Sequence, residues 1–278
     1  MKNSLKIAIL SYRSAPFGGG QGIYVYELSK TLKQLGHQVD IISGPPYPEL
    51  IPGIKLIKLP GLNLFSTFKF RDRLDLFLNK KNKSFDDWYE FSSTLLGGFP
   101  ELQTFGNRAH SYLLDKTYDV VIDNQSISYG AVKIQDSFPL VEMMHHPISK
   151  DYYYDLKFAK GILQSISKIR WYSFLKMQKS SAKKINVVVT PSMNSKEDIH
   201  IDFQVPMENI QVIPNGIDCD IFCPLPKILS KKNRLITTAS ADVPLKGLDF
   251  SLEAIARLKP EYPDIHLMVI GSPRKEGH

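Results

Sequence analysis

The sequence has few cysteines and no long apolar segment. Only Cys219 and Cys223 occur among 278 residues, too few for a disulfide framework or a complete zinc site. No run of 18 or more apolar residues is present, so no membrane-spanning helix is predicted. The apolar stretch at 5–10 is too short for a signal peptide and leads into a glycine-rich loop, which indicates a buried first strand. We therefore expect a cytoplasmic protein.

Several motifs of familiar chemistry are also absent. The loop at 17–22 lacks the third glycine of the dinucleotide fingerprint Gly-x-Gly-x-x-Gly, and no Gly-x-Ser-x-Gly nucleophile elbow occurs. No pattern of a nucleic-acid-binding module is found. His145 and His146 have no third ligand at helical spacing, which argues against zinc. We expect no metal, no cofactor and no nucleic-acid partner.

The net charge of +7 is concentrated in two segments. Residues 55–83 contain eight Lys or Arg and two Asp, and residues 157–184 contain eight Lys or Arg and no acid. Both segments also carry aromatic residues. The pattern is typical of solvated helix faces whose apolar side lies in the core. The alternative is a surface that contacts either the inner face of an anionic membrane or a phosphate-bearing substrate.

Apolar strands alternate with helices along most of the chain. Residues 22–36 have helical spacing that ends at Gly36, and Ser192 is a candidate N-cap for a helix over 193–203. This βαβ alternation predicts an α/β fold with a doubly wound parallel sheet. The expected strands are 5–12, 37–43, 54–60, 118–124, 139–146, 184–192 and 209–216.

A domain boundary is expected after Pro214, where glycine, proline and polar residues become frequent. The first domain would span 1–214. Residues 215–278 contain one further βαβ unit: a strand at 234–240, a helix at 246–259 and a strand at 264–272. One such unit leaves sheet edges open, so we expect the second domain to be incomplete at the end of the chain.

Two motifs point to a ligand site in the first domain. Four glycines at 18–22 precede the first helix, where free N–H groups favour an anion; the alternative is a tight turn. His145 and His146 stand where a parallel strand ends, and ligands bind outside such ends. As neighbours they are expected to point in opposite directions, so one of them faces the crevice. In the second domain, Lys246 begins a helix, as either a phosphate ligand or a surface lysine.

The order of these motifs resembles the retaining glycosyltransferases of family 4, which have the GT-B fold of two Rossmann-like domains. The most specific stretch is "VPMENIQVIPNGIDCDIF" at 205–222, followed by "PLKGLDFSLEAIARLKPEYPDIHLMVIG" at 244–271. The resemblance covers the whole chain, but only about two thirds to three quarters of a typical member. It implies sugar transfer from a nucleotide-sugar to a glycan or lipid-linked acceptor, with retention and without a metal.

The resemblance also implies roles for particular residues. Gly19 and Gly20 would lie against the donor diphosphate or the acceptor, and Lys246 would hold the donor phosphates. His145 would lie beside the transferred sugar, and with His146 it is the catalytic candidate. Asn215 would mark the passage to the donor domain. Acceptor choice would depend on loops in the 44–115 region.

Two departures from the family pattern concern the donor side. Ser240 stands where the family commonly has a basic residue six positions before Lys246. The family's acidic motif, whose glutamates contact the donor, would lie beyond His278. We therefore expect residues 1–278 alone to show no transferase activity.

The pair Asp218 and Asp220 raises the question of a metal site, because some enzymes hold a metal on Asp-x-Asp. The resemblance favours a local role, in which the carboxylates cap backbone N–H groups of the interdomain turn. Three other functions remain open. One is a non-catalytic module that binds a sugar or phosphate and needs no donor. The others, an epimerase and a glycogen-type synthase, lack their own sequence patterns here.

Overall fold

The computed structural model describes residues 4–16, 20–67, 69–225, 231–238 and 247–271. The chain divides into two compact units, residues 1–215 and residues 216–278. The boundary lies one residue beyond the expected one. Each unit is described by itself.

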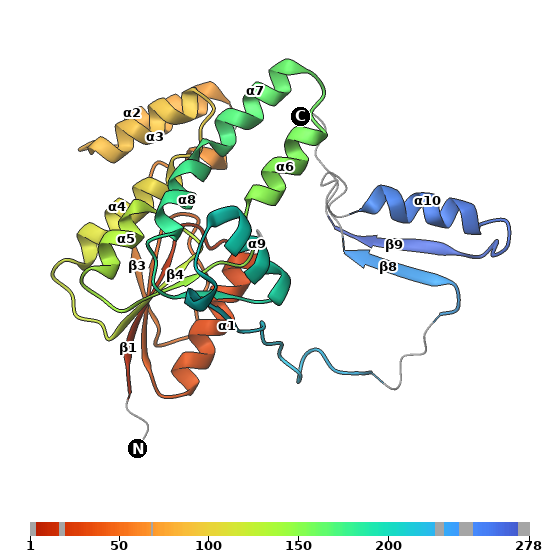
Figure 1. Cartoon of the computed structure of the whole chain (residues 1–278), viewed down its shortest axis with the longest axis horizontal. Helices are drawn as coiled ribbons and strands as arrows, with labels where there is room; N and C mark the ends of the chain where they lie inside the picture. Colours follow the sequence, from red (N-terminus) through yellow and green to blue (C-terminus); the bar gives the residue numbers. More distant parts are fainter. Residues whose placement is uncertain (1–3, 17–19, 68, 226–230, 239–246, 272–278) are drawn as a thin grey trace. The chain divides into compact units, whose positions relative to one another are not determined.

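The first unit contains the expected doubly wound sheet, which has seven described strands in the order β3-β2-β1-β4-β5-β6-β7 (Figure 1). Every neighbouring pair is parallel. The order reverses between β1 and β4, which creates a topological switch point at the carboxyl ends of the strands. The strands are β1 (Lys6–Ser11), β2 (Gln38–Ser43), β3 (Lys55–Lys58), β4 (Val120–Asn124), β5 (Leu140–Met143), β6 (Val188–Thr190) and β7 (Ile210–Val212).

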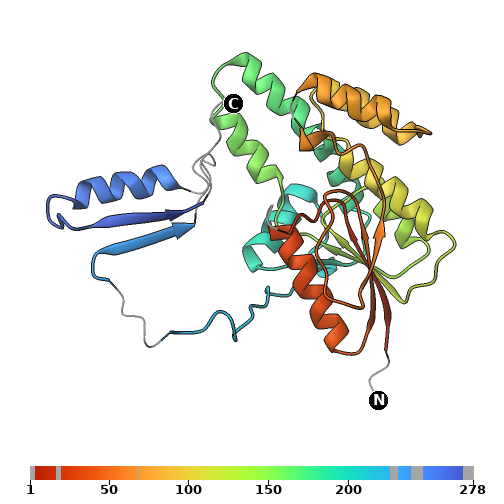
Figure 2. The same cartoon turned by 180° about the vertical axis from the view of Figure 1, so that it is seen from behind.

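Helices cover both faces of this sheet (Figures 1 and 2). Alternate residues of β1 enter different cores, because successive strand side chains point to opposite faces. Ile7 and Ile9 pack with Val25 of α1, whereas Ala8 and Leu10 pack with Phe105 of α4. The described helices are α1 (Gly20–Gln34), α2 (Phe70–Asn79), α3 (Phe85–Leu95), α4 (Glu101–Leu113), α5 (Tyr129–Gln135), α6 (Ser149–Lys157), α7 (Ile162–Trp171), α8 (Leu175–Ala182) and α9 (Met193–Phe203).

The expected helix ends are confirmed. Gly36 has φ of +92°, the left-handed conformation that lets glycine end a helix, and its N–H donates to Lys33 O. Ser192 Oγ accepts from the N–H of Ser195 at 3.1 Å and caps α9.

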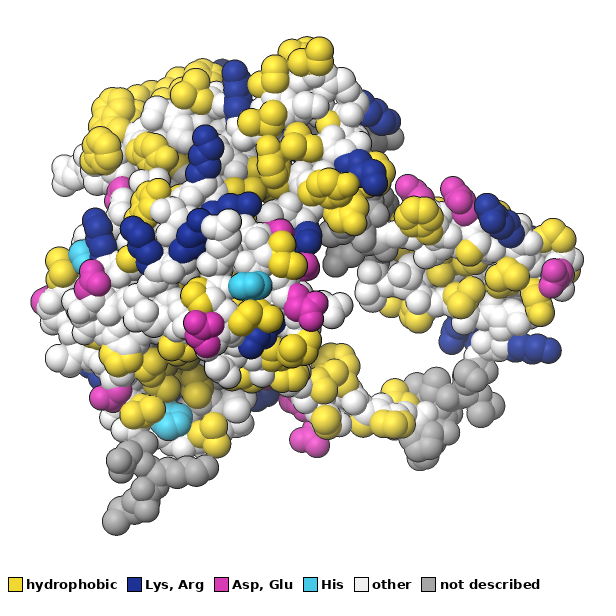
Figure 3. Space-filling model, viewed as in Figure 1, with side chains coloured by type: hydrophobic (Ala, Val, Ile, Leu, Met, Phe, Trp, Pro, Cys, Tyr) yellow, Lys and Arg dark blue, Asp and Glu magenta, His cyan; other side chains and the backbone are white. Residues whose placement is uncertain are grey.

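The basic segments are only partly the solvated faces that the sequence indicates. In α2 the apolar Phe77 is buried, as expected for a helix whose apolar side lies in the core. In α7 no residue is buried, and Ile162 and Leu163 are 79% and 85% exposed. Figure 3 shows hydrophobic side chains gathered over α2 and α7, with Lys and Arg between them. The apolar side of α7 therefore does not lie in the core.

The second unit contains the expected βαβ unit. Strands β8 (Arg234–Thr238) and β9 (His266–Ile270) pair in parallel, and α10 (Leu248–Leu258) connects them. Most described side chains of these three elements are exposed, including Ile236, Phe250 and Ile270.

Candidate functional site

The His145 centre, formed by Tyr24, Asn124, Gln125 and His145, lies at the carboxyl ends of β4 and β5. These strands are neighbours, with Asn124 opposite Met143, so the chain just beyond β5 passes next to the end of β4. His145 Nε2 is 2.9 Å from Asn124 Oδ1, and its ring forms a T-shaped pair with the Tyr24 ring of α1 at a centroid distance of 4.6 Å. Three elements therefore fix the orientation of the half-buried imidazole.

Hydrogen bonds also decide which nitrogen of His145 carries the proton. Asn124 Nδ2 points to Ser11 Oγ at 3.5 Å, which leaves Asn124 Oδ1 to accept from His145 Nε2–H. Nδ1 is then an acceptor. Burial lowers the pKa of His145 to about 4, and the neighbouring His146 contributes to the same shift. The side chain is neutral at pH 7 and acts as a hydrogen-bonding group, not as a cation.

Gln125 holds the backbone around both histidines. Its Oε1 accepts from the N–H of His145 at 3.2 Å, and its Nε2 donates to His146 O at 3.3 Å. Gln125 and Ile127 have φ of +63° and +47°, which is strained for residues with a Cβ. Non-glycine residues in this conformation cluster at functional sites. Gln125 was not predicted from the sequence, although the polar run "DNQS" at the end of a buried strand was a usable signal.

His146 points away from this centre, as the alternation of neighbouring side chains predicts. Its Nε2 lies 3.1 Å from Asp151 Oδ2, and its side chain is 54% exposed. Of the two histidines, only His145 is packed within the His145 centre.

Two fully buried carboxyl groups lie directly before the His145 centre. Asp123 of β4 and Glu142 of β5 are opposite each other in the register, and both are 0% exposed. Asp123 accepts from the hydroxyl of Ser126. Burial raises the pKa of both, and for Glu142 the adjacent Asp123 raises it further, well above its usual value. Two negative charges here would lack water and counter-ions, which opposes the ionisation of both groups together.

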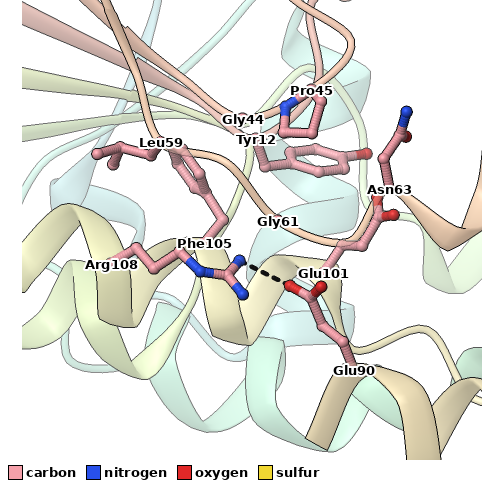
Figure 4. A pocket seen from close by; sticks show the side chains of 10 residues that line it. All are labelled: Tyr12, Gly44, Pro45, Leu59, Gly61, Asn63, Glu90, Glu101, Phe105 and Arg108. Carbon is pink, nitrogen blue, oxygen red and sulfur yellow. Dashed lines mark hydrogen bonds and ion pairs between the residues drawn. The ribbon is translucent and has the colours of Figure 1, made fainter. Parts of the chain in front are cut away.

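A second polar region follows β1, β2 and β3 and includes a pocket lined by α3 and α4 (Figure 4). Glu90 Oε1 accepts from Arg108 and Thr104 at 2.6 Å each, and Glu90 Oε2 accepts from the N–H of Leu62 at 2.8 Å. Arg108 also reaches Asp87 at 3.2 Å, and Lys80 reaches Asp87 at 2.6 Å. We call Lys80, Asp87, Glu90, Thr104 and Arg108 the Arg108 network.

Glu101 lies at the start of α4, beside this network. Arg13, which follows β1, donates to Glu101 Oε2 at 2.8 Å. Burial raises the pKa of Glu101 to about 7, although Arg13 opposes the shift. No motif in the sequence marks Glu101, because its partners come from distant segments.

The predicted glycine loop is described only at its end. Gly20 begins α1 and is exposed, with open space where a Cβ would be. Gly22 has a different role, since a Cβ there would clash with Ala15 O. Gly22 is therefore required by the close approach of this chain's own backbone.

Of the remaining predicted donor-side residues, the structure describes only Asn215. Asn215 is exposed at the end of the first unit, beyond β7. Gly19, Ser240 and Lys246 lie outside the described residues.

Asp218 of the interdomain turn acts locally, as expected. Its Oδ1 accepts from the N–H groups of Asp220 and Ile221 at 3.0 and 3.3 Å. Over the ranges that the structure covers, no three His, Cys, Asp or Glu side chains gather in a way that could hold a metal ion. Within the same ranges, no helix has both the length and the apolar character needed to cross a membrane.

Comparisons with known proteins place the chain in a family. Residues 18–221 match the model of Glycosyltransferase Family 4. The "MMP alpha-(1->4)-mannosyltransferase" of Mycolicibacterium hassiacum is 40% identical over 270 residues, which are 96% of this chain and 64% of the relative. The chain thus spans less than two thirds of the length of this curated relative.

Solved structures show the same fold. The catalytic domain of starch synthase IV from Arabidopsis thaliana has a TM-score of 0.57 at 15% identity, over 98% of this chain and 69% of that chain. A variant of TarM from S. aureus has a TM-score of 0.58 at 12% identity, over 98% of this chain and 73% of that chain. The family match and the 40% identity together show that the chain belongs to glycosyltransferase family 4, with the α/β GT-B fold that its motifs predict.

Proposed function

We propose that this protein is a retaining glycosyltransferase that moves mannose from a nucleotide-sugar to a glycan acceptor without a metal ion. The observation that carries the proposal is the 40% identity to a mannosyltransferase over 96% of the chain. The name of that relative also supplies the proposed α-(1→4) linkage.

In the proposed reaction, the bond between the sugar and the donor diphosphate breaks. Positive charge develops on the sugar ring and negative charge on the leaving diphosphate, so the site must stabilise both. We assign the diphosphate to the start of α1, at Gly19 and Gly20, and to Lys246. A helix N-terminus and a lysine suit this role because both attract phosphate.

His145 is proposed to position the transferred sugar. A neutral imidazole whose Nε2–H is bound to Asn124 has its Nδ1 available to accept from a sugar hydroxyl. A neutral group suits this position, because a nearby cation would oppose positive charge on the ring. His146, which is exposed and bound to Asp151, is given no catalytic role in this proposal, and Asn215 is given only its position at the passage between the units.

The test is a transfer assay with the 278-residue chain and any longer product of its reading frame. The donors are mannose linked to GDP, UDP or ADP, and the acceptor is an α-(1→4)-linked manno-oligosaccharide. We expect the longer product, and not the 278-residue chain alone, to transfer from one donor, with an α-linked product by NMR and no loss of rate in EDTA. If the folded protein binds the oligosaccharide and the longer product also transfers from no donor, the non-catalytic sugar-binding module is the correct function instead.

A peripheral contact with anionic membrane is also proposed, on the observation that α7 exposes its apolar side. Ile162 and Leu163 are exposed, and Figure 3 shows Lys and Arg among the hydrophobic side chains over α7, a combination that suits an anionic lipid surface. We expect the chain to sediment with phosphatidylglycerol vesicles and not with phosphatidylcholine vesicles, and we expect Leu163→Asp to weaken that binding. Equal sedimentation with both lipids would contradict this contact.

A further inference from the structure

The carboxyl groups of Asp123 and Glu142 are buried where the neighbouring positions of the sheet are apolar. Both residues are 0% exposed and lie opposite each other on β4 and β5. Two positions earlier on these strands, Val121 lies opposite Leu140, and on β6 Val188 lies opposite Glu142. All three of these apolar side chains are buried. Since side chains two positions apart point to the same face, the two carboxyl groups interrupt an apolar layer, which costs stability unless they are paired.

Most oxygens of this carboxyl pair are left without a partner. Asp123 Oδ1 and both carboxyl oxygens of Glu142 are buried and have no hydrogen-bond partner among the described residues. Asp123 Oδ2 accepts from the hydroxyl of Ser126. Neither core packing nor side-chain hydrogen bonding therefore accounts for two acids at this place. Positions that break such a local rule are expected mainly at functional sites.

The backbone turn that follows β4 presents its N–H groups to the carboxyl pair. Those of Gln125 and Ile127 lie near Glu142, and those of Ser126 and Ile127 lie near Asp123. Successive N–H groups point to one side where left-handed residues occur in a turn, and such turns attract anionic groups. Gln125 and Ile127 are the left-handed residues here, with φ of +63° and +47°. The carboxyl pair thus lies on the side of the turn to which these N–H groups point.

The same turn holds His145. Asn124 Oδ1 is 2.9 Å from His145 Nε2, and Gln125 Oε1 accepts from the N–H of His145 at 3.2 Å. Left-handed residues that carry a Cβ cost free energy and persist only where the surrounding structure holds them. Glu142 is well placed for this, because it lies on β5, the strand that leads to His145. It therefore connects the strand before the imidazole with the turn that orients the imidazole.

We propose that Glu142, together with Asp123, is a positioning residue for His145: the carboxyl pair holds the turn at 125–127, and the turn holds the imidazole against the transferred sugar. This inference rests on the proposed function, since that function places the sugar at His145. Neither carboxyl group touches the sugar. Removing the Glu142 carboxyl should loosen the turn and admit water to the imidazole. An amide at the same position can accept from the turn and donate to Asp123, so it should preserve the arrangement.

The first test is an NMR titration of the His145 imidazole in the folded 278-residue chain, with His145→Ala to identify its signal. In the wild type, burial lowers the pKa of His145 to about 4. We expect Glu142→Leu to raise this pKa to about 5 or above, because a hydrated imidazole returns toward its usual value. Glu142→Gln should keep the wild-type pKa. The titratable groups next to the imidazole are Tyr24 and His146, which these variants leave in place.

Glu101→Leu is the matched control, because it also replaces a largely buried carboxyl group of the same domain with an apolar side chain. The described partner of Glu101 is Arg13, so the control should leave the pKa of His145 unchanged. Ser126→Ala removes the hydroxyl that Asp123 binds, and it replaces Glu142→Leu if that variant does not fold in urea denaturation. An unchanged His145 pKa in the folded variant, or an equal rise in Glu101→Leu, would contradict the positioning role.

The second test separates this inference from the function on which it rests. In the longer product that transfers, Glu142→Leu should lower kcat for mannosyl transfer about tenfold, since a small misplacement of an oriented group is costly. Glu142→Gln should restore kcat. If the pKa of His145 rises in Glu142→Leu and no product of the reading frame transfers, the positioning of the imidazole is supported and the proposed function fails. If the longer product transfers and Glu142→Leu changes neither pKa nor kcat, the positioning role is wrong and the proposed function stands.

Discussion

The Arg108 network and the His145 centre are polar regions of the same domain, and they differ in how they handle charge. In the Arg108 network, the buried carboxylates of Asp87 and Glu90 face Arg108 and Lys80. Burial raises the pKa of Asp87, but hydrogen bonds from Lys80 and Ser84 outweigh burial and bring this pKa below its usual value. Around His145 the imidazole has a lowered pKa and is neutral, and burial raises the pKa values of the nearby carboxyl pair. The first arrangement stabilises the fold. The second leaves a neutral, oriented imidazole where a sugar is proposed to bind.

Removing Arg108 is expected to have the largest effect on stability. Arg108→Ala leaves Asp87 and Glu90 buried with less compensation, and we expect the free energy of unfolding to fall by about 3 kcal/mol in urea denaturation. Lys116→Ala, which breaks the exposed pair with Asp115, is the control and should leave the stability nearly unchanged. A similar small change for both variants would show that the network is not structural.

Removing the His145 side chain tests whether the His145 centre binds the transferred sugar. We expect His145→Ala, introduced into the longer product that transfers, to lower the rate of mannosyl transfer by about 100-fold, because one oriented hydrogen-bonding group at the reacting sugar is lost. The free energy of unfolding should change less than in Arg108→Ala. An unchanged transfer rate in a folded variant would contradict the assignment of the sugar to this centre.

The carboxyl pair predicts a dependence of stability on pH. The folded-state pKa of Glu142 is raised above the unfolded value of about 4.5, so its contribution is complete below pH 4.5 and is lost as the pH rises through the folded pKa. For each unit by which folding raises the pKa of Glu142, the free energy of unfolding falls by about 1.4 kcal/mol once the pH exceeds the folded-state pKa.

Glu142→Gln should remove this decrease in the free energy of unfolding with rising pH, while keeping the shape of the side chain. The titrating group that faces Glu142 is Asp123, and the N–H groups of Gln125 and Ile127 also lie near it. The measurement is urea denaturation from pH 4 to pH 8 for both proteins, and their difference cancels the contribution of Glu101. Parallel curves for the two proteins would show that Glu142 is not held in its protonated form.

The smallest effect is expected at His146. Its pair with Asp151 is exposed, so His146→Ala should change the free energy of unfolding by less than about 1 kcal/mol and leave mannosyl transfer unchanged. The variant matches His145→Ala in residue type and position along the chain. A large loss of transfer in His146→Ala would reverse the roles given to the two histidines.

Local patterns were enough for much of the fold and for part of the site. The seven strands of the first domain were predictable from apolar runs, and the ends of α1 and α9 from Gly36 and Ser192. His145 was identifiable because it follows a buried strand. The helices α2, α3 and α4 were not assigned, although their apolar residues have helical spacing, because no motif marks the 44–115 region and its charged residues find partners only in the folded chain.

The sequence by itself determined the α/β alternation, the family motifs and the strand end at which His145 stands, because hydrophobic periodicity and strand ends are local properties. Only the tertiary structure decided that Asn124 and Gln125 orient His145, that Asp123 meets Glu142 across two strands, and that Glu101 retains an open oxygen while Glu90 does not. These features depend on contacts between residues far apart in the chain. Burial and partner geometry, which fix charge and hydrogen bonding, exist only once those segments pack together.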